Sequence, residues 1–310
     1  MPQSGSGMHE QPQTMTATSP EHEFYAAESR LTALGRHAAS VDELPNDLAG
    51  LVTIIQGLVI YDVVASDFYG HELSQERQHT IHLRPIEEVL DGVLALDQRP
   101  LSVARPPQRR LAGRCHHYAR LLVAMLRAKG VPARVRCGFG VYFLPDSFED
   151  HVVCEYWNEN QDRWVLVDAQ LDEVFRERLG FTHDPLDVPR DQFVVAAEAW
   201  ERCRSGGADP DRFGISFAGF RGLWFVASTL VRDVAALNKV EVLPWDAWGA
   251  QPEPGHTMSD GELAFFDEVA ALTRDPDESF EKLRERCASD DRLRVPATVL
   301  NSILDRPEAI

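Results

Sequence analysis

Cysteine, lysine and long apolar runs are scarce in this sequence, and each shortage excludes a class of structure. The 310 residues include five cysteines. This odd number, without a C-x-x-C pair, is typical of reduced thiols and not of a disulfide framework or a zinc cluster. The most apolar run, residues 48–61, is interrupted by Gln56 and is too short to cross a bilayer. The formal charge is −18, which disfavours binding to nucleic acid, whose phosphates would be repelled.

Export and cofactor signals are also missing. The first lysine or arginine is Arg30, so the charged start of a secretory signal peptide is absent and we expect a cytoplasmic location. The sequence has no internal repeat, no glycine-rich nucleotide loop and no dinucleotide fingerprint. We therefore expect no cofactor, no nucleic acid partner and no membrane partner. The oligomeric state stays open.

Composition and periodicity divide the chain into four regions. Residues 1–20 are rich in Ser, Gly, Gln, Thr and Pro and are predicted to be a disordered tail. Residues 21–104 are predicted to form an N-terminal helical region. Residues 105–175 are the predicted core, and residues 176–310 a mainly helical region packed on it.

Several individual helices are predicted outside the core. Apolar spacing at three and four residues, proline in a first turn and an S-x-x-E capping box are the signals used. They predict helices over 48–64, from Pro85 onward, over 191–205, over 219–238, and over 263–272 after the capping box at Ser259.

A cysteine begins the most clearly patterned helix of the core. After Gly113 and Arg114, apolar residues recur with the spacing of a helix that buries one face, and Gly130 followed by Pro132 supplies a stop. Cys115 is therefore expected in the first turn, where unpaired N–H groups and the helix dipole favour a thiolate. The same N–H groups could stabilise the oxyanion formed on an attacked carbonyl.

A histidine and an aspartate lie on the two strands of a predicted hairpin. Two segments rich in Val, Tyr and Trp, one from His151 to Trp157 and one ending at Asp168, flank a polar stretch. Because strand side chains alternate, pairing of Trp157 with either Asp162 or Trp164 places Asp168 on the same face as His151. The carboxylate could then accept a hydrogen bond from the imidazole, whereas a slip of one residue would separate them.

The order Cys115, His151, Asp168, with the W-V-L-V-D sequence that ends at the aspartate, resembles the transglutaminase-like superfamily, a papain-related group of Cys-His-Asp enzymes. The resemblance covers roughly residues 105–172. It implies an α+β fold of papain/transglutaminase type, in which the nucleophile helix packs on an antiparallel sheet, with N- and C-terminal helical elaborations. It also implies that Cys115 attacks an amide or thioester carbonyl while His151 takes the thiol proton and Asp168 orients the ring.

The resemblance leaves the substrate and the acceptor open. Water as acceptor would make an amidase or peptidase, and an amine would make an amide-forming acyltransferase. Cleft shape and exclusion of water choose between them, so the residues alone do not. The expected partner is a small-molecule or peptide acyl donor, carrier-bound donors included. The alternative from another class is a non-catalytic transglutaminase-like binding module.

Weaker candidates surround the nucleophile. Papain-like enzymes often use an upstream Gln as second oxyanion donor and transglutaminases a Trp; no Trp precedes Cys115, so Gln108 is the candidate. Arg109, Arg110 and Arg114, bunched with Arg105, could form a basic rim for a carboxylate or phosphate. A solvated arginine-rich loop is the alternative.

Trp157 shares the strand face of His151 and is a candidate substrate contact. Adjacent helix residues point about 100° apart, so Cys115, His116 and His117 are not expected to bind a metal together.

Overall fold

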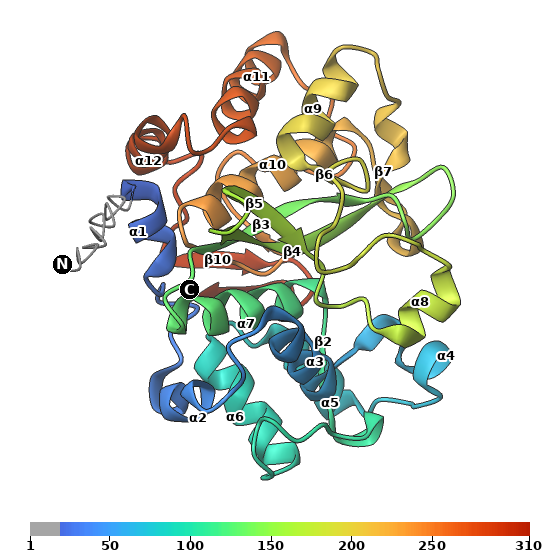
Figure 1. Ribbon diagram of the computed structural model, residues 1–310. Helices are drawn as coiled ribbons and strands as arrows, with labels where there is room; N and C mark the ends of the chain where they lie inside the picture. The colour runs from blue at the N-terminus through green and yellow to red at the C-terminus, as the bar shows by residue number, and fades with distance from the viewer. Residues whose placement is uncertain (1–18) are drawn as a thin grey trace, which may run out of the picture.

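A mixed sheet crosses the middle of the molecule in the computed structural model, which describes residues 19–310 (Figure 1). Its strand order is β6-β3-β4-β7-β8, and β5 pairs with β4. Only β4 and β7 pair in parallel; the other neighbours in this sheet are antiparallel. The strands are β3 (Ala133–Gly140), β4 (Phe148–Asn158), β5 (Arg163–Val167), β6 (Phe193–Val195), β7 (Phe213–Ile215) and β8 (Phe220–Arg221).

Helices cover both sides of this sheet (Figure 1). On one side lie α7 (Cys115–Ala128), α2 (Ala38–Asp42), α3 (Leu48–Leu58) and α6 (Ile86–Leu96). On the other side lie α9 (Ala196–Arg204), α11 (Asp260–Arg274) and α12 (Phe280–Ser289). The remaining α-helices are α1 (Pro20–Ala26), α4 (Ala65–Tyr69), α5 (Gln75–His79), α8 (Glu173–Leu179) and α10 (Leu223–Leu237). The predicted α+β class, in which the helix that begins at Cys115 packs on the sheet, is confirmed.

Helix α7 is buried from Cys115 to Arg127. Its apolar residues share one buried cluster with Val135 of β3 and Cys154 of β4, so the helix and the sheet form a common core. Gly130, with φ of +74°, follows the last turn in the left-handed conformation that glycine adopts without steric cost. The predicted start and stop of this helix are both confirmed.

The β4–β5 hairpin adopts one of the two predicted registers. Trp157 lies opposite Trp164, and the ladder ends where Cys154 meets Val167. Strand β7 joins β4 farther along, at residues 148–149. His151 therefore lies between the two partners β5 and β7, on a stretch of β4 that another element can approach.

The N-terminal region departs from the prediction at one helix. Helix α3 ends at Leu58, whereas the apolar pattern predicted a helix to residue 64. The chain continues as β1 (Val59–Tyr61), which pairs in parallel with β2 (Leu111–Gly113), and then as the 3₁₀ helix η2 (Asp62–Val64). The β-branched residues of β1 favour a strand, but its partner lies far along the chain and no local pattern reveals it.

The N-terminal tail and the helix predicted from Pro85 have different outcomes. Helix α6 begins directly after Pro85, as predicted. Helix α1 begins at Pro20, the last residue of the predicted tail. The rest of that tail, residues 1–18, lies outside the described residues.

The C-terminal region contains the predicted helices and additional strands. Helix α11 starts with the predicted capping box, in which Ser259 N–H donates to Glu262 Oε2 (2.8 Å). Helices α9 and α10 each begin later than predicted, because the short strands β6 and β8 precede them. The sequence did not predict the small sheet of β9 (Asp246–Ala247), β10 (Thr298–Asn301) and β11 (Arg306–Ala309).

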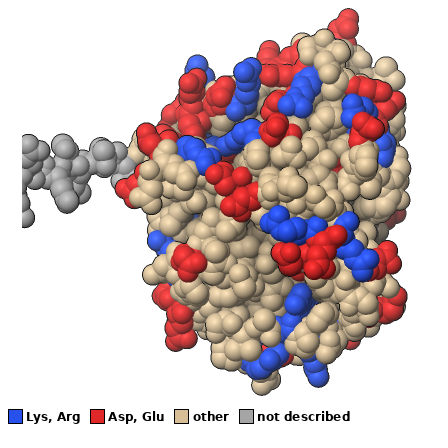
Figure 2. All heavy atoms as spheres, turned by 45° about the vertical axis from the view of Figure 1, so that its right-hand side comes forward, with Lys and Arg blue, Asp and Glu red and all other residues tan. Residues whose placement is uncertain are grey.

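The surface carries charges of both signs. Figure 2 shows acidic and basic side chains side by side over one face. Within residues 19–310, no helix combines the length and apolar character needed to span a membrane.

Candidate active site

The start of α7 is held by the neighbouring strand pair. Strand β2 ends at Gly113, whose backbone runs so close to β1 that an added Cβ would lie 2.7 Å from Val59 Cγ1. Arg114 follows and donates hydrogen bonds to both carboxylate oxygens of Asp62, with its Nε 3.0 Å from Oδ1. Cys115 is then the first residue of the helix and is 6% exposed. The nucleophile candidate is thus fixed on a rigid element and not on a loop.

The histidines that follow Cys115 are poor bases. His117 Nδ1 accepts a hydrogen bond from the Arg114 backbone N–H (3.1 Å) and caps the helix. Burial, together with the positive charges of Arg120 and Arg114, lowers the pKa of His117 to about 3. Burial likewise lowers the pKa of His116 well below its ordinary value. Both rings are therefore neutral near pH 7 and are not poised to bind a proton.

His151 and Asp168 lie in contact on the face that the register predicted. His151 Nε2 is 2.7 Å from Asp168 Oδ2, and both side chains are buried. The same carboxylate oxygen accepts a hydrogen bond from Tyr142 Oη (2.7 Å), and Oδ1 accepts one from the Gln170 backbone N–H (3.1 Å). The carboxylate is therefore held in one orientation, and it holds the imidazole.

Cys115 is the third group at this ring. Burial alone would lower the pKa of His151, but the charge and hydrogen bond of Asp168, together with a hydrogen bond and the charge of Cys115, raise it to about 10. Because Nε2 faces Asp168, Nδ1 is the nitrogen that can face the sulfur. The structure thus brings together the three residues that the sequence singled out, in the order sulfur, imidazole, carboxylate.

Aromatic rings surround the imidazole. The centroid of the Phe143 ring lies 4.8 Å from that of His151, and Tyr142 and Phe193 lie 6.2 and 6.3 Å away. His183 packs on Tyr142 with a centroid separation of 4.9 Å. Such a shell limits access of water to the His151–Asp168 pair and strengthens its electrostatic interaction.

The arginines before Cys115 have distinct roles in the structure. Arg105 is 1% exposed and donates to backbone carbonyls of its own loop, including that of Pro100 (2.8 Å). Arg109 is exposed and reaches the Leu96 carbonyl (3.2 Å), and Arg110 donates to the Arg105 carbonyl (2.8 Å). Arg105 and the Asp62-bound Arg114 are therefore engaged within the protein, whereas Arg109 is the member most available to a ligand.

The two other candidates lie in different places. Gln108 is exposed on the 3₁₀ helix η4 (Pro107–Arg109), three residues before β2 begins. Trp157 lies near the far end of β4, where its ring packs against His22 (centroids 4.2 Å apart) and Trp164 (5.8 Å). Trp157 lies six positions along the strand from His151, roughly 20 Å at the usual rise. The structure does not bring Trp157 to the site.

Three residues near the site were missed by sequence reasoning. Tyr142 lies just after β3 and donates a hydrogen bond to Asp168. Tyr61 is the last residue of β1 and lies close to Cys115. Burial, together with the charge of Cys115, raises the pKa of Tyr61 well above its ordinary value. Arg232 of α10 pairs with Asp150, directly before His151, at 2.7 Å. Their partners are distant in the chain and no local motif marks them, so no sequence signal could have found them.

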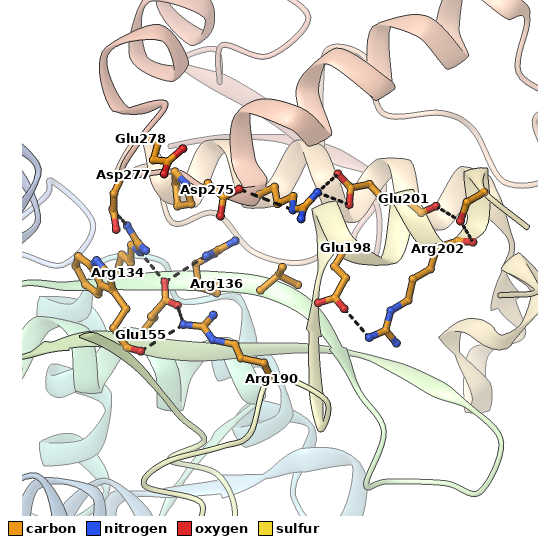
Figure 3. A pocket seen from close by; sticks show the side chains of 15 residues that line it. Arg134, Arg136, Glu155, Arg190, Glu198, Glu201, Arg202, Asp275, Asp277 and Glu278 are labelled. Atoms are coloured by element: carbon orange, nitrogen blue, oxygen red, sulfur yellow. Dashed lines mark hydrogen bonds and ion pairs between the residues drawn. The ribbon is translucent and has the colours of Figure 1, made fainter. Parts of the chain in front are cut away.

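A large hollow lies elsewhere on the molecule. It has a volume of about 900 Å³, and neither Cys115, His151 nor Asp168 lines it. Figure 3 shows Arg134, Arg136 and Arg190 around Glu155, with Arg134 Nε 2.6 Å from Glu155 Oε2. Its charged side chains largely pair with one another, so few convergent groups remain free for a ligand. The chemistry of the side chains favours the Cys115 site over this hollow as the functional site.

Comparisons with known proteins agree with this placement. Residues 90–169, which include Cys115, His151 and Asp168, match the Transglutaminase-like superfamily. A protein-glutamine gamma-glutamyltransferase of Pseudomonas aeruginosa is 40% identical over 76 residues, which cover 22% of this chain and 11% of that protein. This chain thus spans only about a tenth of the length of that relative.

A solved structure is also similar, at a lower level. The crystal structure of a candidate cysteine protease from Cytophaga hutchinsonii has a TM-score of 0.31 and 17% identity, over 58% of this chain and 50% of that one. The sequence match over the helix and hairpin decides the assignment. Residues 90–169 of this chain form a transglutaminase-like superfamily domain.

Proposed function

We propose that this chain is a cysteine-dependent acyl-transfer enzyme that forms a thioester acyl-enzyme on Cys115. The observation that carries the proposal is the hydrogen bond between His151 Nε2 and Asp168 Oδ2 (2.7 Å), with Cys115 close enough to the same ring to help raise the histidine pKa. Sulfur, base and orienting acid are the groups that a thiol nucleophile needs. The superfamily match over the same residues supports the proposal.

In the first step, His151 holds the proton of the Cys115 thiol as an imidazolium. The sulfur attacks the carbonyl carbon of an amide or thioester, and the C–S bond to the enzyme forms. When the tetrahedral intermediate collapses, the bond to the leaving amine or thiol breaks and His151 returns its proton to that group. Backbone N–H groups of the first turn of α7 are the donors placed for the oxyanion, with Gln108 as the candidate for a second donor.

In the second step, an acceptor resolves the thioester. Water or an amine attacks the acyl carbon and gives its proton to His151. The bond between the acyl carbon and the Cys115 sulfur then breaks, and the free cysteine is restored. The similar Pseudomonas protein is named as a gamma-glutamyltransferase, which favours an amine, and the residues of the site do not by themselves exclude water. Both acceptors are therefore included in the proposal, and the acyl donor is a small molecule or a peptide, carrier-bound donors included.

Substitution tests the proposal. Cys115→Ala and His151→Ala should each abolish turnover of acyl donors, and the double variant should lose no more than either single one, because the residues act as a unit. Near-native turnover in either single variant contradicts the proposal. Product analysis with and without a primary amine then assigns the acceptor: a new amide product identifies transfer, and only free acid identifies hydrolysis.

A further inference from the structure

Arg120 and His116, both on α7, are buried without hydrogen-bond partners. Each is 1% exposed, and all three guanidinium nitrogens and both imidazole nitrogens lack a partner among the described residues. The two residues are four apart and so lie on the same helix face. Burial of unpaired polar groups is costly, and most costly for a charged one. We therefore expect a ligand to bind these two side chains.

The two side chains line one internal cavity. Its walls come from α7, β3, β4, α10 and the segment after α10, and they include Cys137, Arg232 and Glu241. The cavity has a volume of about 10 Å³, which is room for one molecule or ion of about the size of water. His116 directly follows Cys115 in the chain, so the cavity lies beside the first turn of α7.

The other charges on the walls are already matched. Glu241 accepts hydrogen bonds from Arg127 Nη1 (2.8 Å) and Ser29 Oγ (2.7 Å), which occupy its two oxygens. Arg232 is paired with Asp150. Among the described residues that line the cavity, Arg120 is therefore the charged side chain that has no bonded counter-ion.

A second nearby acid is also taken, and the guanidinium keeps its charge. Asp246 is held by Arg84 through two hydrogen bonds, of 2.6 and 3.1 Å. Burial lowers the pKa of Arg120 to about 10, so the group stays charged at neutral pH. Burial keeps the pKa of His116 well below its ordinary value, so the ring is neutral and one of its nitrogens carries a hydrogen.

We propose that this cavity binds one small monovalent anion of the halide class, held by the Arg120 guanidinium and an N–H of His116. A water molecule would satisfy hydrogen bonds but would leave the buried charge uncompensated, whereas an anion meets both needs. Because α7 and α10 both line the cavity, the anion ties the C-terminal region to the helix that carries Cys115. The proposal does not depend on the acyl-transfer activity.

Thermal unfolding of the full chain in matched salts tests the proposal. At equal ionic strength, NaCl and NaBr should raise Tm above its value in sodium gluconate, and the rise should saturate. A rise of about 2–4 °C is expected once chloride exceeds its Kd about tenfold. Arg120→Met should remove this rise, and Arg284→Met, at an exposed helix position, should keep it. The readout is the difference between salts, because removal of an unpaired buried charge can itself raise Tm.

A bromide-soaked crystal of the unmodified protein gives a second test that needs no variant. An anomalous peak within hydrogen-bond distance of the Arg120 guanidinium is expected. The proposal is overturned by equal Tm values of the unmodified protein in the three salts, by an unchanged chloride-dependent rise in a folded Arg120→Met, or by a cavity that contains only water in bromide.

Discussion

His151 Nε2 lies 2.7 Å from Asp168 Oδ2, although 17 positions separate the two residues in the chain. The contact settles which ring nitrogen faces the acid and leaves the other for the sulfur of Cys115. It depends on the register of one hairpin, since a shift by one residue would place the two side chains on opposite faces.

Cys115 should react first with a limiting electrophile. Cys203 is more exposed than Cys115, so exposure alone would predict that Cys203 reacts first. Burial, however, raises the pKa of Cys203 to about 12 and that of Cys287 to about 11, and a thiolate is the reactive form. Iodoacetamide followed by peptide mapping should therefore label Cys115 before the other cysteines. His151→Ala should slow labelling of Cys115 alone. Faster labelling of Cys203 than of Cys115 would argue against an activated thiol.

Tyr142 should act as a positioning residue for Asp168. Tyr142→Phe removes one of the hydrogen bonds to Asp168 Oδ2 and should lower kcat about tenfold at unchanged KM. Asp168→Asn should lower kcat by about a hundredfold or more and still leave residual activity, because the base is misoriented but present. Tyr156→Phe is the matched control, because Tyr156 lies on the face of β4 opposite to that of His151. Equal kcat for Tyr142→Phe and Tyr156→Phe would remove Tyr142 from this role.

The protonated His151 should stabilise the fold in a defined pH range. Its pKa of about 10 in the folded protein lies above the ordinary value of about 6.5. The contribution, on the order of a few kcal/mol, is thus complete below about pH 6.5 and is lost as pH rises through about 10. Urea unfolding should show the unmodified protein losing its advantage over His151→Gln between these limits. A constant difference from pH 6 to pH 10 would mean that the ring is not held as an imidazolium.

Helix α7 and the hairpin could be predicted from the sequence because their signals are local. The apolar spacing after Cys115, the stop at Gly130 and the alternation around His151 lie within short segments. Strand β1 could not be predicted, since its partner β2 lies beyond several helices. The Tyr142–Asp168 and Arg232–Asp150 contacts likewise arise only when distant segments meet. The basic rim predicted before Cys115 is reduced, because Arg105 and Arg114 have partners inside the protein.

Arg109 and Arg110 should favour anionic acyl donors if they form the remaining rim. Their replacement by alanine in one variant should lower turnover of an anionic donor and spare a neutral donor of similar size, since the guanidinium groups act on the donor's charge. Steady-state rates with the paired donors, measured at low and high salt, provide the check. Unchanged turnover of both donors would leave the two arginines without a role in binding.

The central claim is that Cys115 carries the acyl group. Intact-mass spectrometry after brief exposure to a panel of thioester and activated amide donors tests it most directly, with peptide mapping to locate the adduct. The account predicts a mass increase equal to one acyl group, on Cys115 and released by hydroxylamine, and none in Cys115→Ala; His151→Ala should form the adduct far more slowly. An acyl group on another residue, or an adduct of equal yield in Cys115→Ala, would contradict it.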